Sequence, residues 1–341
     1  MLQSAALRYN QAKINSLSYK CTQVGLLSLL SKDKSFALPI IGNPTLNKLG
    51  LHTLRIRLAD LALSVRRFQV AGFNRPAEYS EFKQNGVLVL DNFLPDGEFQ
   101  QLLTEIKSTM NKVDETDPIQ NYGDQGFGQK HNFKWGFDRF DGDTLNRFYS
   151  ITDQHPNTQA FVNNPRLTKL TRYLAGTYHD ESKYDVYKLH HGKEDSNADS
   201  QKLIHRDTFH SAIKLWYFLE DVKPEHGPFH YAAGTNRMSR NRLAWEKQRS
   251  IKASLENTGG AFRISEPELN DLKDGQLKSF PVKANTLVIA DIRGFHCRGA
   301  ALENQDRLSI YANIRPSPYL FAFNAGTFKK MAKIFKGKQK T

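Results

Sequence analysis

The stretch NTLVIADIRGFHCRGAALENQDRLSIYANI, residues 285–314, decides the fold. Its first eight residues are a short, mostly apolar run rich in β-branched side chains, and residues 307–314 alternate polar and apolar side chains as a half-buried strand does. Both patterns predict β-strands, and His296 stands between them. A third apolar run, residues 212–219, follows the triplet His205-Arg206-Asp207. Polar residues at several strand ends are expected to converge in a barrel.

His205, Asp207 and His296 are the candidate metal ligands. Two imidazoles and one carboxylate can occupy one face of an octahedral metal ion and leave three positions open, which suits non-haem Fe(II) and the activation of O2. An HxD triplet alone is weak support, since a chain with 11 histidines is expected to contain one by accident. The competing triplet at His179 lies in a polar turn without a strand pattern before it. The strand patterns around His205, Asp207 and His296 therefore favour these three residues as the iron site.

Arg307 follows His296 by 11 residues and supplies a second element. A guanidinium at this place, helped by the Ser309 hydroxyl, could anchor the far carboxylate of a dicarboxylic co-substrate through a bidentate contact. Together with the three candidate ligands, this pair indicates an oxygenase that uses Fe(II), 2-oxoglutarate and O2.

About 70% of the chain, residues 81–318, resembles the phytanoyl-CoA dioxygenase (PhyH) family of Fe(II)/2-oxoglutarate oxygenases. The similar segments are GVLVLDNFL at 86–94, the HxD triplet, WYFLEDV at 216–222, the Gly234-Thr235 turn, and His296 and Arg307 at the family's spacing. The chain departs from the family at Asn236, where a histidine is frequent, and at Arg298, where a small residue is common. The resemblance implies a mainly β protein with flanking helices, a double-stranded β-helix of the jelly-roll, cupin-like type.

The resemblance also implies roles. His205, Asp207 and His296 would bind iron, Arg307 would bind 2-oxoglutarate, and Trp216 would contact it. The reaction would hydroxylate a substrate C–H bond and release succinate and CO2. Halogenating relatives typically replace the carboxylate ligand by a small residue, so Asp207 favours hydroxylation. Two alternatives stay open: a non-catalytic barrel that binds a small molecule, and a nucleic-acid demethylase of the same mechanistic class.

Three regions are expected: a basic helical extension over 1–78, the oxygenase barrel over 81–318, and a basic tail over 319–341. Inside the barrel domain we predict helices over 96–110, from 157 towards 174, and over 237–250. A long loop without clear periodicity is predicted over 111–145, with 132–137 as a candidate lining of a substrate mouth. In the tail, a helix is expected only near 328–335.

One amphipathic helix is predicted in the N-terminal extension. Its apolar side chains recur at steps of three and four, at Leu51, Leu54, Leu58, Leu61, Val65 and Phe68. Its other faces carry Arg55, Arg57, Arg66 and Arg67. One interpretation is a helix docked on the outside of the barrel. The other is a basic surface helix that also touches anionic lipid.

The net charge of +13 is unevenly placed. Residues 1–75 carry +9, residues 307–341 carry +8, and the middle is −4. A mildly acidic core argues against nucleic acid in the active site, and it favours a small-molecule or lipid-like substrate. The basic ends suit peripheral contact with an anionic membrane.

The two cysteines, Cys21 and Cys297, are too few for a disulfide framework and fit a reducing, cytoplasmic compartment. A mitochondrial transit segment also fits the N-terminus, because residues 1–32 contain four basic and no acidic side chains.

Overall fold

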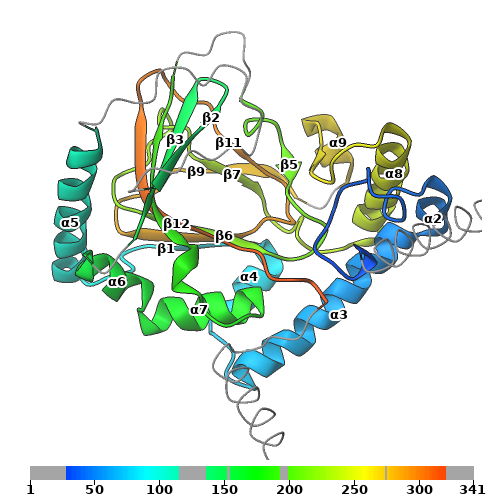
Figure 1. Ribbon diagram of the computed structural model, residues 1–341, viewed down its shortest axis with the longest axis horizontal. Coiled ribbons are helices and arrows are strands. Elements are labelled where there is room, and N and C mark those ends of the chain that lie inside the picture. The colour runs from blue at the N-terminus through cyan, green and yellow to red at the C-terminus, as the bar shows by residue number, and fades with distance from the viewer. Residues whose placement is uncertain (1–27, 115–135, 152–153, 193–198, 273–274, 320–341) are drawn as a thin grey trace, which may run out of the picture.

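Two antiparallel β-sheets form the centre of the computed structural model, and helices surround them (Figure 1). The structure describes residues 28–114, 136–151, 154–192, 199–272 and 275–319. Within them the larger sheet has seven strands, in the order β1 (Val87–Leu90), β10 (Thr286–Asp291), β6 (Ile213–Phe218), β12 (Asp306–Ile314), β4 (Tyr184–His190), β3 (Thr144–Ser150) and β2 (Gly136–Asp141). The smaller sheet has five, in the order β8 (Phe262–Arg263), β5 (His205–Arg206), β11 (His296–Arg298), β7 (Phe229–Ala232) and β9 (Leu277–Phe280). The predicted double-stranded β-helix is confirmed.

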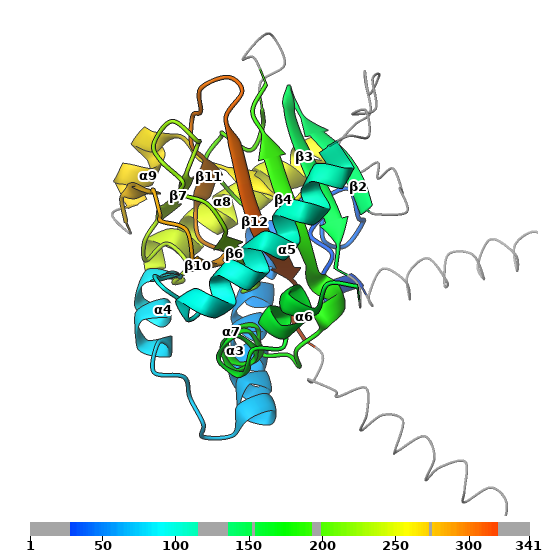
Figure 2. The ribbon, with the colours of Figure 1, turned by 90° about the vertical axis from the view of Figure 1, so that its left-hand side faces the viewer.

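The helices lie outside this pair of sheets (Figure 2). In the described part of the chain they are α2 (Pro44–Leu49), α3 (Leu51–Ala71), α4 (Tyr79–Asn85), α5 (Asp96–Asp114), α6 (Pro156–Val162), α7 (Pro165–Ala175), α8 (Arg240–Glu256) and α9 (Glu266–Leu272), with a short 3-10 helix, η1 (Glu181–Lys183). The helix predicted from 157 towards 174 is in fact two, because Pro165 cannot continue α6 and instead begins α7 behind the Asn164 cap. The helix predicted over 237–250 begins at Arg240, where the Ser239 side chain caps it, and extends to Glu256.

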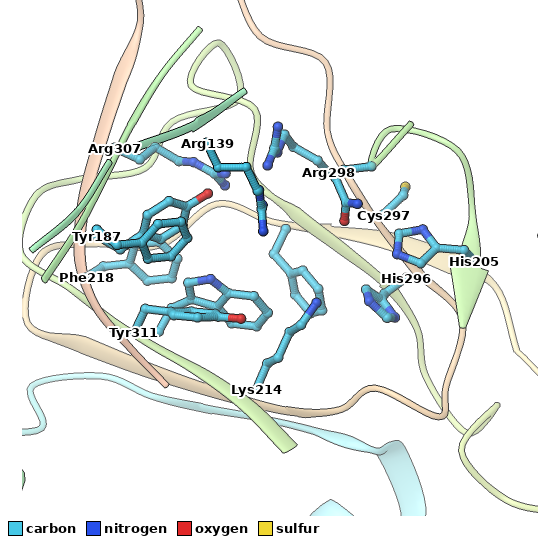
Figure 3. A pocket seen from close by; sticks show the side chains of 14 residues that line it. Arg139, Tyr187, His205, Lys214, Phe218, His296, Cys297, Arg298, Arg307 and Tyr311 are labelled. Carbon is cyan, nitrogen blue, oxygen red and sulfur yellow. The ribbon is translucent and has the colours of Figure 1, made fainter. Parts of the chain in front are cut away.

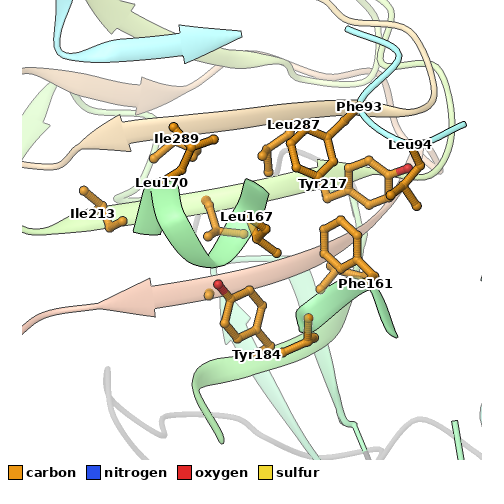
Figure 4. Close-up of a cluster of buried hydrophobic side chains, with 14 of the residues drawn as sticks. Phe93, Leu94, Phe161, Leu167, Leu170, Tyr184, Ile213, Tyr217, Leu287 and Ile289 are labelled. Carbon is orange, nitrogen blue, oxygen red and sulfur yellow. The ribbon is translucent and has the colours of Figure 1, made fainter. Parts of the chain in front are cut away.

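The alternation of side chains along β6 determines which residues of the larger sheet lie on its core face and which lie on its pocket face. Leu215 and Tyr217 belong to the main hydrophobic core, which also contains Leu167 of α7 (Figure 4). Because successive side chains of a strand point to opposite faces, Lys214 and Trp216 face the other way, into the space between the two sheets. The helices therefore cover one face of this sheet, and the other face lines a pocket.

The smaller sheet packs its outer face on α8 and α9. Trp245 of α8 and Leu269 of α9 share a buried cluster with Phe295 and Cys297 beside β11. The Trp245 and Phe295 rings meet edge to face with their centroids 5.0 Å apart. This packing fixes the backbone on both sides of His296.

A hairpin occupies part of the predicted 111–145 loop. Residues 136–145 are not loop: β2 and β3 pair from Gly136 opposite Tyr149 to Asp141 opposite Thr144, and β3 then pairs with β4. Ring stacking supports the hairpin, since the centroids of Phe137 and Phe148 lie 4.7 Å apart. Cross-strand contacts of this kind do not appear in a one-dimensional hydrophobic period. Residues 115–135, and with them most of the predicted mouth, lie outside the described residues, as does the tail helix expected near 328–335.

The predicted amphipathic helix forms as α3 and docks on the outside of the barrel, beside α7 and α8. It docks through a mixed face that includes Ile56, Ala59, Leu63 and Val70, together with buried polar side chains. The polar ones are paired: His52 Nε2 lies 2.9 Å from Glu246, the Arg55 guanidinium donates to three backbone carbonyls, and Arg66 donates to the Ser317 carbonyl. The apolar row chosen from the sequence is on the other side of the helix and faces solvent.

Candidate metal centre and pocket

The register of two short strands brings the candidate ligands together. In the smaller sheet, His296 of β11 is the direct antiparallel partner of His205 of β5, and Asp207 follows β5 immediately. One ligand atom from each residue can be chosen so that all three lie within 4.8 Å of one another. The His205 Nε2 atom is 3.5 Å from Asp207 Oδ1, and the His296 Nε2 atom is 3.9 Å from Asp207 Oδ2.

The hydrogen bonds of the two histidines fit metal binding. The Nδ1 atom of His205 lies 2.7 Å from the Leu203 carbonyl oxygen, and that of His296 lies 3.0 Å from the Gly294 carbonyl oxygen. A carbonyl can only accept, so each Nδ1 carries a hydrogen, and in the neutral imidazole Nε2 is then the atom with the free lone pair. Both Nε2 atoms are buried without a hydrogen-bond partner. A bound divalent ion would give these two buried nitrogen atoms, which lie near one carboxylate, the partner that they lack.

Electrostatics keep His296 and Asp207 in their metal-binding protonation states. Burial, with a smaller effect from the neighbouring His205, lowers the pKa of His296 to about 3, so its imidazole is neutral at neutral pH. Burial acts to raise the pKa of Asp207, but the Lys214 ammonium and the neighbouring histidines outweigh it and hold that pKa well below its ordinary value. The Lys214 Nζ atom lies 2.7 Å from Asp207 Oδ2, and Arg315 lies 3.5 Å from the same oxygen. The carboxylate is therefore ionised and already oriented.

A pocket of about 580 Å³, partly open to solvent, extends from the two histidines into the space between the sheets (Figure 3). Arg307 lines it on the side away from the histidines (Figure 3), and Trp216 lines it as well. Ser309 is buried on the same face of β12, but it does not line the pocket, and its hydroxyl lies 3.5 Å from the Tyr187 carbonyl.

Arg307 has the properties of an anion-binding residue. Among the described residues its guanidinium forms no ion pair, and its Nε atom is buried without a hydrogen-bond partner. Burial lowers its pKa to about 10, an effect to which the Arg298 charge contributes and which the neighbouring Tyr187 opposes. Keeping a cation there costs free energy that a carboxylate would recover.

Three further pocket residues, Arg139, Lys214 and Arg298, were not among the residues chosen from the sequence. The alternation along β6 that places Trp216 in the pocket also places Lys214 there, so the sequence pattern could have identified Lys214. Arg139 could not be identified because the sequence predicted a loop where it lies in strand β2. Arg298 donates to Asp199, Asp141 and Asn146, which ties β11 to the hairpin that roofs the pocket.

Behind the metal ligands lies a fully buried ionic network. The Arg206 side chain points away from the pocket and makes a bidentate contact with Glu246, with N–O distances of 2.9 and 2.7 Å. The same carboxylate contacts Arg242 at 3.0 Å and His52 at 2.9 Å. The middle residue of the HxD triplet thus anchors β5 to α8 and α3, because Arg206, Arg242 and His52 converge on the Glu246 carboxylate.

Two imidazoles, an ionised carboxylate and a separate buried guanidinium in one jelly-roll pocket define the class of mononuclear non-haem iron oxygenases that use a 2-oxo acid. The family model described as phytanoyl-CoA dioxygenase (PhyH) matches residues 82–307. The chain therefore belongs to the phytanoyl-CoA dioxygenase family, as an Fe/2-oxoglutarate oxygenase with the triad His205, Asp207 and His296.

Solved structures with weak similarity include several enzymes of this kind. The epimerase SnoN in complex with Fe3+, alpha ketoglutarate and nogalamycin RO is 17% identical, with a TM-score of 0.39, over 70% of this chain and 84% of that one. HygX from Streptomyces hygroscopicus, with nickel and 2-oxoglutarate bound, is 17% identical with a TM-score of 0.39, over 73% and 90%. EctD from S. alaskensis with bound Fe is 13% identical with a TM-score of 0.42, over 71% and 76%. No curated protein matches the chain significantly.

Proposed function

We propose that the protein hydroxylates a C–H bond of a small organic molecule and that Arg307 binds the 2-oxoglutarate it consumes. The observation that carries the proposal is the pairing of two features in one pocket. One is a metal-binding triad whose two histidine Nε2 atoms have no hydrogen-bond partner, and the other is the buried guanidinium of Arg307, which forms no ion pair with a carboxylate of the described residues. A dicarboxylic 2-oxo acid has a chelating end for the first and a free carboxylate for the second.

Each residue has a distinct task in this proposal. His205, Asp207 and His296 hold Fe(II), which together with 2-oxoglutarate and O2 supplies the oxidation of the C–H bond, with succinate and CO2 as co-products. Arg307 holds the distal carboxylate, with the Ser309 hydroxyl as a second donor after a rotation away from the Tyr187 carbonyl. Trp216 packs along the co-substrate between these two ends.

Asp207 supports hydroxylation over halogen transfer. A halide needs a coordination position of its own, and in this chain the carboxylate occupies the third protein position. Epimerisation, the reaction named for SnoN, is distinguished from hydroxylation by its product. Hydroxylation adds one oxygen atom to the substrate, whereas epimerisation leaves the substrate mass unchanged.

The test is 2-oxoglutarate turnover by the Fe(II)-loaded full-length protein, measured as succinate while metabolite fractions are screened for stimulation and for a mass gain of one oxygen. Asp207→Ala and His296→Ala are each expected to abolish succinate formation and leave the fold intact, since the ligands sit at a solvent-connected pocket. His226→Ala, a histidine outside the pocket, serves as the matched control. Turnover at the wild-type rate in either ligand variant would refute the triad. Absence of iron-dependent succinate with every fraction would favour a non-catalytic binding barrel.

A further inference from the structure

The outward face of α3 is a continuous apolar surface. Five side chains at steps of four and three residues are exposed by 41–66% of their area: Leu54, Leu58, Leu61, Val65 and Phe68. Phe73, exposed by 93%, extends this row beyond the end of the helix, since its ring centroid lies 5.3 Å from that of Phe68. We call these six residues the outer row. The helix lies at the edge of the molecule, so no other described element covers the row (Figures 1 and 2).

Docking of α3 does not explain the outer row. The helix is held by its opposite face, where Ile56, Ala59 and Leu63 are buried and where Arg55 and His52 have hydrogen-bond partners. Single exposed apolar residues are ordinary on a protein surface, but a contiguous row of this length marks a site of interaction. Something outside the described residues is therefore expected to cover it.

The charges around the outer row are basic. Lys48, Arg57 and Arg75 are exposed along the helix and at its two ends. The helix contains one acidic residue, Asp60, whose carboxylate forms an ion pair with Arg293. An apolar row flanked by cations, with its single acid neutralised, has the composition of a helix that lies in the interface of an anionic bilayer.

Both ends of the described chain meet α3 at one residue. The Arg55 Nε atom donates to the Leu29 carbonyl at 3.2 Å, and the Tyr319 hydroxyl donates to the Arg55 carbonyl at 3.1 Å. Residues 1–27 carry three basic and no acidic side chains, and residues 320–341 carry six lysines and no acid. The basic segments 1–27 and 320–341 thus continue from residues that contact the docked face of α3, opposite the outer row.

We propose that the outer row of α3 docks on an anionic lipid surface, with its leucines and Phe68 at the boundary between headgroups and acyl chains. No helix among the described residues is long and apolar enough to cross a bilayer, so the contact would be peripheral. The positive charge around the outer row favours anionic lipid over a second copy of the chain or the chain's own terminal segments. A second copy would bring Arg57 against a like-charged helix, and the chain's own terminal segments carry the same sign as the helix.

Vesicle co-sedimentation of the full-length protein tests the proposal. Vesicles of phosphatidylcholine with 30% phosphatidylserine are expected to bind the protein at low salt, and pure phosphatidylcholine vesicles are not. Leu61→Glu should weaken binding at least about tenfold, because a leucine leaves the lipid and an anion approaches anionic headgroups. The matched control is Leu302→Glu, the same change at a side chain of similar exposure, 63% against 66%, on the loop between β11 and β12. The control should bind like the unaltered protein.

Three results would overturn the proposal. The first is that the protein stays in the supernatant with anionic vesicles at low salt. The second is that Leu61→Glu and Leu302→Glu lose binding equally, since only the net charge would then matter. The third comes from sedimentation velocity without lipid: a dimer that Leu61→Glu dissociates would show that a second copy covers the outer row. Because iron and 2-oxoglutarate are not needed for any of these measurements, failure here leaves the proposed oxygenase activity untouched.

Discussion

Replacement of Arg307 by methionine should separate co-substrate binding from folding. Burial lowers the pKa of this guanidinium from its ordinary value to about 10, so keeping it charged costs the folded protein up to about 3 kcal/mol. Methionine keeps much of the side-chain volume and removes the charge. The free energy of unfolding of the iron-free protein should therefore stay the same or rise.

Binding of 2-oxoglutarate should respond in the opposite direction. Loss of a charge-assisted bidentate contact is worth about 2–3 kcal/mol, so the KM for 2-oxoglutarate should rise roughly 30- to 150-fold. Fe(II) affinity should change little, because Arg307 contacts none of the three ligands. The assays are succinate formation against 2-oxoglutarate concentration, Fe(II) titration by tryptophan fluorescence, and urea unfolding.

Arg298→Met is the matched control for this experiment. Arg298 lines the same pocket, but its guanidinium pairs with Asp199 and Asp141. Its removal leaves the buried Asp199 without its ion-pair partner, whereas Asp141 keeps Arg139, and should destabilise the fold by about 3–5 kcal/mol. An Arg307→Met protein that loses iron and keeps its KM for 2-oxoglutarate would refute the assignment of the anchor.

Two further predictions concern stability. Glu246→Ala leaves the buried Arg206 and Arg242 without their carboxylate and should lower the free energy of unfolding in urea by about 3–5 kcal/mol. The control Glu268→Ala, at a more exposed ion pair, should lower it by less than about 1 kcal/mol. Equal losses in the two variants would contradict the network. Burial lowers the pKa of His210 to about 3, so from pH 6.5 downward the unfolded chain binds a proton that the folded protein does not. This group should therefore lower the free energy of unfolding by about 1.4 kcal/mol for each unit that the pH is decreased. The urea midpoint of His210→Gln should depend less steeply on pH. An unchanged slope would contradict the buried neutral imidazole.

The barrel and the triad could be predicted from the sequence because their signals are local. The β-branched run of β10 and the alternation of β12 reflect burial on two faces and on one face, and the HxD spacing is a property of one turn. The orientation of α3 could not be predicted in the same way. The spacing of apolar residues predicts that a helix has an apolar face. It does not predict which face docks, because docking depends on the contacts that His52, Arg55 and Arg66 make with other parts of the chain.

The hairpin of β2 and β3 escaped prediction for a related reason. Its residues are rich in Asp and Gly, and its strands are stabilised by pairing with β4 and by the stacking of Phe148 on Tyr187, with centroids 4.6 Å apart. These partners lie some 40 positions away in the sequence, as the Tyr187 hydroxyl bonded to Asn146 shows with a separation of 41 residues. Propensity alone cannot weigh a contact at that separation.

The contact between Lys214 and Asp207 limits the denticity of the carboxylate. One carboxylate oxygen, Oδ2, is held by the ammonium at 2.7 Å, so Oδ1 alone is free of a cation. A carboxylate restricted in this way would take one coordination position of a bound ion, and the two histidines would take two more. An octahedral ion would then have three positions for small molecules, enough for a chelating oxo acid and O2. A strand residue outside the recognised motif thereby sets how many reactants the centre can hold at once.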